Sequence, residues 1–307
     1  MEERDPRLPM RVALGQLHEL SHHDLTFARQ LGASGIQLNT PILPGEKRWE
    51  VADLRWLRQR CESYGLRLEA IENTPITFYD KAMLGLPGRD EQIAHYQATI
   101  RHLGAAGIPV LGYHWMPLQV WRTSYEPGRG GALASAFDLA AVTRQPLVWG
   151  RATHPLLEGR EITAEEMWDN DRYVMQAVLP VAEEAGVTLA LHPDDPPLPS
   201  LGGVARIFGA FAGFQRAMEE IPSPHSGLDF CMGCWSEMAS ESGPCTAGRD
   251  RRDPLFRAAR EDRLRACPRC PGPRTVFHGV LPGRRQRGRG GGDPSAQRGG
   301  LRRVHPG

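Results

Sequence analysis

Short apolar runs alternate with longer segments of helical periodicity through the first three quarters of the chain. Leu54, Leu57 and Cys61, for example, fall on one face of a helix. Thr163 and Glu166 form a capping-box pattern, which marks the start of another helix. The predicted strands are 10–16, 35–39, 67–73, 109–115, 187–193 and 227–233, and the predicted helices are 24–35, 51–65, 91–107, 163–186 and 204–221.

This alternation predicts an α/β fold with a parallel sheet and helices outside it. Units of about 30 to 40 residues favour a (β/α)₈ TIM barrel over an open sheet, but a full barrel needs eight strands. Six strands are found, so we expect an incomplete barrel of about six strand–helix units. The G-x-G-x-x-G motif of dinucleotide-binding folds does not follow the first strand.

Charge and composition exclude several classes of protein. The formal net charge is +1, which gives no sign of a nucleic-acid or membrane partner. The chain lacks an apolar run long enough to span a membrane, and its start lacks the apolar core of a signal peptide. Six unevenly spread cysteines do not form the framework of a secreted disulfide-rich protein. A cytoplasmic protein is therefore expected.

The composition changes abruptly near Pro244. Residues 244–307 contain 16 Arg, 5 acidic residues, 11 Gly and 8 Pro, with few large apolar side chains. Such a segment cannot bury enough apolar surface to offset the entropy lost on ordering. We therefore expect an incomplete TIM-barrel catalytic domain over residues 1–243, followed by a disordered or irregular Arg/Gly/Pro-rich tail over 244–307.

Polar residues gather where the predicted strands end, which is where barrel enzymes carry their catalytic groups. His192 ends the fifth strand and is the best candidate for a metal ligand, although a buried histidine with satisfied hydrogen bonds is the alternative. Cys231 ends the sixth strand and offers a thiolate that suits a borderline metal, unless it is simply a small buried residue. His114 and Asp194 lie at the same predicted rim.

Three stretches resemble the mannonate dehydratase family: residues 71–117, 189–208 and 226–238. The specific part is HPDDPP at 192–197, followed about 35 residues later by FC-x-G. The resemblance runs from about Arg11 to Met238. It implies a metal-dependent, xylose-isomerase-like barrel that converts D-mannonate into 2-dehydro-3-deoxy-D-gluconate and water in glucuronate breakdown. It also implies that His192 and Cys231 bind Fe²⁺ or Mn²⁺.

The resemblance extends to the segment after the fourth strand, where Met116-Pro117 and Trp121-Arg122-Thr123 match the family. The guanidinium of Arg122 suits a carboxylate bidentately, although a surface arginine is an equal alternative. We predict that Arg122, His114 and Asp194 contact a small sugar acid. A homo-oligomer is left open.

The other two metal ligands of the family lie in motifs that do not occur here, so the catalytic residues stay unassigned. With chosen codons, a one-base shift converts residues 253–257 into Ile-Arg-Tyr-Phe-Gly, a phrase typical of the family. The same shift converts 261–270 into Lys-Ile-Val-Tyr-Val-His-Val-Arg-Asp-Val, which contains the missing histidine strand. We hypothesise a one-base frameshift within about 239–250. On this hypothesis the chain folds poorly alone and has little activity.

Two other functions remain as alternatives. One is a related metal-dependent barrel isomerase or epimerase, against which the two family motifs argue. The other is a zinc-binding or RNA-binding protein. Cys231/Cys234 and Cys267/Cys270 form two C-x-x-C pairs, but 32 residues separate them, against a usual spacing of about 15 to 20. The Arg/Gly run at 284–292 lacks nearby aromatic residues, which weakens an RNA-binding role.

Overall fold

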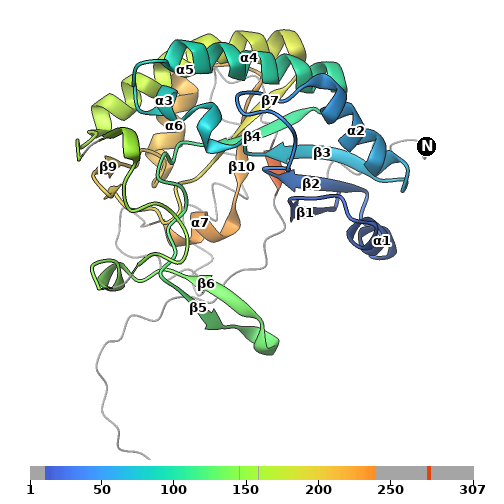
Figure 1. Cartoon of the computed structure of the whole chain (residues 1–307), viewed down its shortest axis with the longest axis horizontal. Helices are drawn as coiled ribbons and strands as arrows, with labels where there is room; N and C mark the ends of the chain where they lie inside the picture. Colours follow the sequence, from blue (N-terminus) through green and yellow to red (C-terminus); the bar gives the residue numbers. More distant parts are fainter. Residues whose placement is uncertain (1–10, 145, 158, 239–274, 278–307) are drawn as a thin grey trace, which may run out of the picture.

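The fold is built on a curved parallel sheet of seven strands in the order β1-β2-β3-β4-β7-β10-β11 (Figure 1). The computed structural model describes residues 11–144, 146–157, 159–238 and 275–277. Within these residues β1 and β11 form the two ends of the sheet and are not joined to each other. The strands are β1 (Ala13–Leu17), β2 (Gly35–Asn39), β3 (Arg67–Glu72), β4 (Val110–His114), β7 (Thr188–His192), β10 (Ser226–Phe230) and β11 (Thr275–Phe277).

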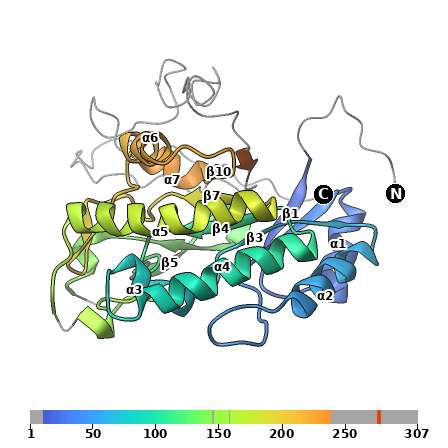
Figure 2. The ribbon, with the colours of Figure 1, turned by 90° about the horizontal axis from the view of Figure 1, so that it is seen from above.

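Helices cover the outer face of this sheet. Figure 2 shows α2, α4 and α5 side by side along one face. The predicted capping box is confirmed at the start of α5, where Thr163 and Glu166 cap each other's backbone. The helices are α1 (His22–Gln30), α2 (Val51–Glu62), α3 (Asp80–Met83), α4 (Arg89–Ala106), α5 (Ala164–Ala185), α6 (Phe211–Glu220) and α7 (Met232–Glu237), with short 3₁₀ turns at η1 (Ile76–Phe78), η2 (Arg129–Gly131), η3 (Leu139–Ala141) and η4 (Pro155–Leu157).

The expected parallel α/β sheet is confirmed, but the strand count was one too low. β11 pairs with β10 and comes from residues 275–277, inside the segment expected to be irregular. The rest of the predicted tail, and the frameshift hypothesis with it, lies outside the described residues. The sheet therefore has seven strands where the hydrophobic pattern predicted six.

The helix predicted over 204–221 was also wrong in its first half. Here β8 (Ser200–Leu201) and β9 (Val204–Ala205) form a small hairpin, and α6 begins only at Phe211. Gly202 and Gly203 both have positive φ, which favours the hairpin turn over a helix. The backbone of Ile162 bonds to Gly203 and Ala205, which pulls this segment away from helical geometry.

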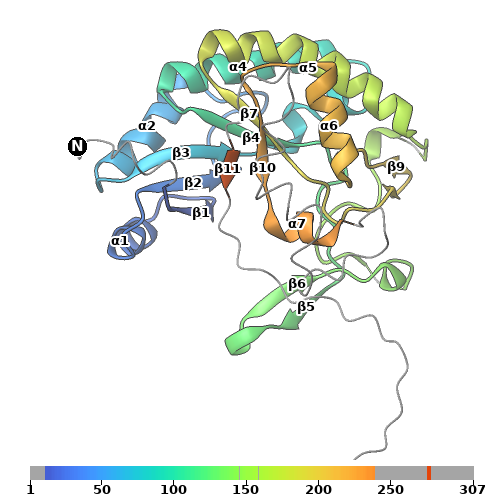
Figure 3. The same cartoon turned by 180° about the vertical axis from the view of Figure 1, so that it is seen from behind.

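The connection between β4 and α5 is long and carries its own hairpin of β5 (Ser124–Pro127) and β6 (Leu133–Ala136). The hairpin projects from the body of the molecule (Figure 3). Farther along this connection, Nε2 of His154 donates to Asp80 at the start of α3, at 3.3 Å. Both side chains are buried, so this contact anchors the connection to the helical layer.

The core lies between the sheet and its helices. Its largest fully buried side chains include Trp49, Phe78 and Trp115. Among the helices that the structure describes, none has the length and apolar character needed to cross a membrane.

Candidate metal centre

Three buried side chains with metal-binding atoms converge where β7 and β10 end. They are His192, the last residue of β7, Cys231 directly after β10, and Cys234 in α7. Their ligand atoms all lie within 4.8 Å of one another. The structure therefore brings together His192 and Cys231, which the sequence analysis paired, and adds Cys234.

The imidazole of His192 is oriented by its neighbour. Nδ1 lies 2.7 Å from the carbonyl oxygen of Pro193, and because a carbonyl only accepts, Nδ1 carries the proton. Nε2 is then the nitrogen left to face the sulfur of Cys231. A histidine held in this way through one nitrogen presents the other to a metal ion in a fixed direction.

Cys231 and His192 stabilise opposite charges on each other. Burial lowers the pKa of His192, but the hydrogen bond with Cys231 and the charges of Asp229, Cys231 and Glu72 outweigh it and raise the pKa to about 10. The pKa of Cys231 is lowered, first by the hydrogen bond from Cys234 and, against the effect of burial, by His192. Cys234 shows the reverse, since its hydrogen bond to Cys231 raises its pKa. Without a metal the two groups compensate each other's charge, and a divalent cation that replaced the proton between them would meet an imidazole nitrogen and a thiolate together.

His114 lies beside this cluster, paired with His192 across the β4–β7 ladder. Its Nδ1 accepts the backbone N–H of Met116 at 3.2 Å, so Nε2 carries the proton. Burial, together with the charges of His192 and Arg206, lowers the pKa of His114 to about 3. His114 is therefore a neutral hydrogen-bond donor at physiological pH.

Arg122 lies at the same rim, in the connection after β4. Its guanidinium forms two hydrogen bonds with the carboxylate of Asp195, from Nη1 at 2.7 Å and from Nη2 at 2.5 Å. Both side chains are mostly buried. The predicted carboxylate clamp thus already holds a carboxylate of the protein, and its contact with a substrate stays a prediction.

Asp194 is buried inside the loop after β7. One oxygen accepts the backbone N–H of Phe208 at 2.7 Å, and the other lies 3.6 Å from Nη1 of Arg206. Arg206 itself is buried and donates to the carbonyl oxygen of Gln119. Asp194 and Arg206 join three loops below the rim, and a contact between Asp194 and a substrate stays a prediction. The sequence analysis missed Arg206 because it fell within a predicted outer helix.

Two further carboxylates lie within the curve of the sheet. Glu72 at the end of β3 accepts from Gln16 and Gln37, at 3.1 and 3.0 Å. Gly112 of β4 lies between Glu72 and Asp229 of β10, where a Cβ atom would approach both carboxylate side chains within 3.3 Å. The glycine thereby leaves room for two acidic groups whose charges both act on His192.

Backbone strain gathers at the same rim. Gln16 near the end of β1, Thr40 after β2 and Asn73 after β3 all have positive φ although none is glycine. Such conformations cost free energy and cluster at functional sites. Their position at the carboxyl ends of the strands supports this rim as the functional face.

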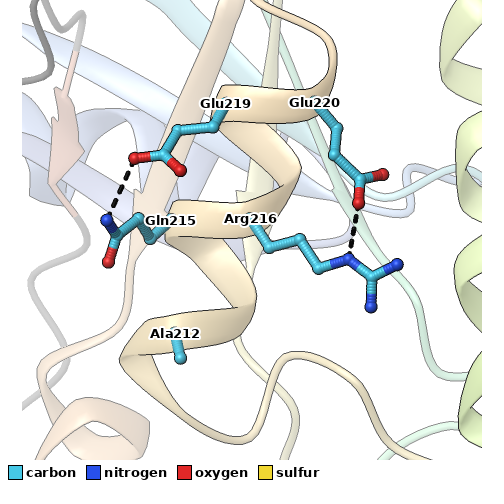
Figure 4. Close-up of a pocket in the computed structure, with 5 residues that line it drawn as sticks. All are labelled: Ala212, Gln215, Arg216, Glu219 and Glu220. Atoms are coloured by element: carbon cyan, nitrogen blue, oxygen red, sulfur yellow. Dashed lines mark hydrogen bonds and ion pairs between the residues drawn. The ribbon is translucent and has the colours of Figure 1, made fainter.

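A shallow hollow on the outside of α6 has a different character. Figure 4 shows Arg216 paired with Glu220 and Gln215 with Glu219 along one side of the helix. Ala212 completes the lining. These side chains satisfy one another, so the hollow presents no group set apart for chemistry.

Cys234 is the member of the cluster that the sequence analysis left out of the metal site. Its signal was present in the C-x-x-C spacing, which places the second thiol one helical turn after the first. In the sequence alone, that spacing resembles half of a four-cysteine zinc site. The second pair of that site, Cys267 and Cys270, lies outside the described residues.

Proteins named mannonate dehydratase match the chain over this region. "Mannonate dehydratase" of Streptococcus pneumoniae (strain 70585) is 33% identical over 224 residues, covering 67% of this chain and 60% of the relative. "Mannonate dehydratase" of Endomicrobium trichonymphae is 30% identical over 234 residues, covering 68% and 64%. The chain thus spans less than two thirds of the length of these relatives.

A solved structure and a family profile agree with these matches. The crystal structure of mannonate dehydratase from Streptococcus suis serotype 2 superposes with a TM-score of 0.62 at 28% identity, covering 74% of this chain and 64% of that one. The profile of the D-mannonate dehydratase (UxuA) family matches residues 16–244, which include His192, Cys231 and Cys234. The chain therefore belongs to the D-mannonate dehydratase family.

Proposed function

We propose that this chain is a mannonate dehydratase, which converts D-mannonate into 2-dehydro-3-deoxy-D-gluconate and water with Fe²⁺ or Mn²⁺. The observation that carries the proposal is the meeting of His192 and Cys231 at the carboxyl ends of neighbouring strands, in a chain of this family. The chain spans less than two thirds of the length of its relatives. The activity is therefore proposed for an enzyme of their full length.

The reaction removes a proton beside a carboxylate and expels hydroxide from the next carbon. A bound divalent ion supplies a Lewis acid that lowers the pKa of sugar hydroxyls and stabilises negative charge. His192 and Cys231 hold that ion, since an imidazole nitrogen and a thiolate both suit Fe²⁺ and accept Mn²⁺ less readily.

The remaining rim residues bind and orient the sugar acid in this proposal. His114, neutral and with its proton on Nε2, would donate a hydrogen bond to a substrate oxygen. Arg122 contacts the substrate carboxylate in this proposal, with Asp195 fixing the direction of its guanidinium. The groups that move the proton are not assigned to any described residue.

The test measures 2-keto acid formation from D-mannonate with Fe²⁺ or Mn²⁺, using both this chain and the product of a frame-restored gene. We expect turnover from the frame-restored protein, none from its His192→Ala variant, and little from this chain. A frame-restored protein that folds, binds metal and isomerises or epimerises another sugar, but leaves D-mannonate unchanged, would overturn the proposal.

A further inference from the structure

The thiol of Cys234 lies against the proposed metal site without a role in it. We infer that Cys234 is a third protein ligand, so that the described residues offer the ion one imidazole and two thiolates. The inference rests on the proposed metal site and not on the identity of the substrate. Its basis is the distance among the ligand atoms of His192, Cys231 and Cys234, which lie within 4.8 Å of one another. Atoms bound to one tetrahedral ion at about 2.0 to 2.3 Å each lie within that separation.

Local structure holds Cys234 in this position. Cys231 is the N-cap of α7, and residues three apart on a helix lie on the same face. Cys234, one helical turn after Cys231, therefore lies on the same face of the helix. Gly233 places no side chain between the two thiols. A Cβ atom at this position would lie at van der Waals distance from the Cys231 sulfur.

Packing of the next residue prevents α7 from turning away. The ring of Trp235 stacks on Phe230 at 5.2 Å between centroids and contacts Phe214 at 4.9 Å. Trp235 packs in this aromatic cluster, and the side chain of Cys234, one residue earlier, leaves the helix about 100° away from it. Cys234 is 3% exposed and faces the site from within the protein.

Two other roles for Cys234 fit the structure less well. A redox pair with Cys231 needs access for an oxidant, and both thiols are buried beneath the rim. A purely structural thiol packs among apolar side chains, as Cys61 does in α2, where burial raises its pKa to about 12. Cys234 instead lies beside a second thiol and an imidazole, and zinc and similar ions are bound by this combination of groups in proteins.

The second thiolate changes which ion the site prefers. Thiolates select softer and borderline ions, so a site with two of them favours Fe²⁺, Co²⁺ or Zn²⁺ over Mn²⁺. A site of this kind also holds its ion more tightly than one with a single thiolate. Cys234 therefore acts on metal choice, which is measured without any turnover.

The test is a titration with Co²⁺, whose near-ultraviolet charge-transfer band reports bound thiolates. The full chain is used with Cys245, Cys267 and Cys270 replaced by serine, so that only the thiols of the described residues remain. We expect Cys234→Ser to lower the band per bound ion to about half and to weaken Co²⁺ binding by about tenfold or more. Cys61→Ser, the matched control, removes a buried thiol outside the site and leaves both values unchanged.

The outcomes separate this inference from the proposed function. If Cys234→Ser binds Co²⁺ with the parent's band and affinity, Cys234 is not a ligand, while the site of His192 and Cys231 stands. If the folded parent binds no Co²⁺, the inference and the proposed metal site both fail. Circular dichroism checks folding, and Cys234→Ala serves as a second variant if the serine disturbs α7.

Discussion

Arg122 and Asp195 are joined by two hydrogen bonds, which tie the connection after β4 to the loop after β7. Their side chains are 18% and 13% exposed, so the pair is shielded from most of the solvent. A paired, planar contact of this kind fixes direction as well as charge. Arg122 is therefore held in place before any substrate arrives.

The first prediction concerns the energy of this pair. Alanine at Arg122, at Asp195 and at both should give a double-mutant cycle with a coupling of about 1 to 3 kcal/mol in the free energy of unfolding. The measurement is chemical unfolding of the four proteins. Additive single effects would show that the contact contributes nothing to the fold.

Metal binding should stabilise the chain. An ion that binds only the folded state adds about 2.7 kcal/mol at a concentration of one hundred times its Kd. We expect Fe²⁺ under anaerobic conditions to raise the Tm, and His192→Ala or Cys231→Ala to abolish the increase. His23→Ala, which removes an exposed imidazole in α1, is the control and should keep it. An equal increase in all four proteins would place the binding elsewhere.

Asp171 should make stability depend on pH. Its carboxyl is buried in α5, and burial, aided by the charge of Glu220 and opposed by Arg172 and Arg216, raises its pKa from 3.8 to about 7. The folded chain thus holds this proton more tightly than the unfolded chain does, so the contribution to stability is greatest below pH 4 and is lost as pH rises to 7.

Asp171→Asn removes that loss. The variant should match the wild type near pH 4 and exceed it at pH 8 by about 2 to 4 kcal/mol in the free energy of unfolding. Asp169→Asn is the control, because Asp169 lies on the same helix but at the surface, paired with Arg172. A constant difference between Asp171→Asn and wild type at every pH would contradict the prediction.

The contact between His154 and Asp80 should keep the long β4–α5 connection on the body of the protein. His154→Ala leaves a buried carboxylate short of a partner and should cost about 3 kcal/mol of stability. It should also speed proteolytic cleavage within residues 116–162. His22→Ala, at an exposed position, should leave the cleavage rate unchanged. If His154→Ala is cleaved no faster than wild type, the anchor lies elsewhere.

The reading-frame hypothesis is tested at the level of the gene. We expect a one-base change within about codons 239–250 to restore a histidine-containing strand and to lengthen the match to the relatives. Sequencing the nucleotides answers this directly. A gene in which no single-base shift yields that strand would exclude the hypothesis.

The sequence predicted the parts of this fold that are governed by local pattern. The apolar run before His192 located β7, and Ile36 and Leu38 on either side of Gln37 located β2, while the capping box located α5. The pattern assigned Val204 to a helix, which was wrong. Backbone hydrogen bonds from the glycine turn to the distant residue Ile162 hold this segment in a hairpin despite its apolar helical periodicity. It also missed β11, since three residues carry too little periodicity to be recognised.

The site divides in a similar way. Residues at strand ends, such as His192 and His114, are predictable because topology brings those ends to one rim. The partners of the site residues cannot be predicted in the same way. Asp195, for example, bonds to Arg122 although 73 positions of sequence separate them. Arg206 pairs with Asp194 and bonds to Gln119 from a segment that the pattern predicted as helix. Such contacts depend on three-dimensional packing that no local spacing encodes.

The hydrogen bond from His192 to the carbonyl oxygen of Pro193 has a consequence for how this site tolerates change. Its donor and acceptor are adjacent in the chain, so the orientation of the imidazole is inherited with a dipeptide and does not depend on a distant partner. Substitutions in neighbouring strands can therefore alter the substrate or the ion without turning the ring. The orientation of this imidazole is set within the loop itself. Other residues of the rim can therefore be substituted while this orientation is kept.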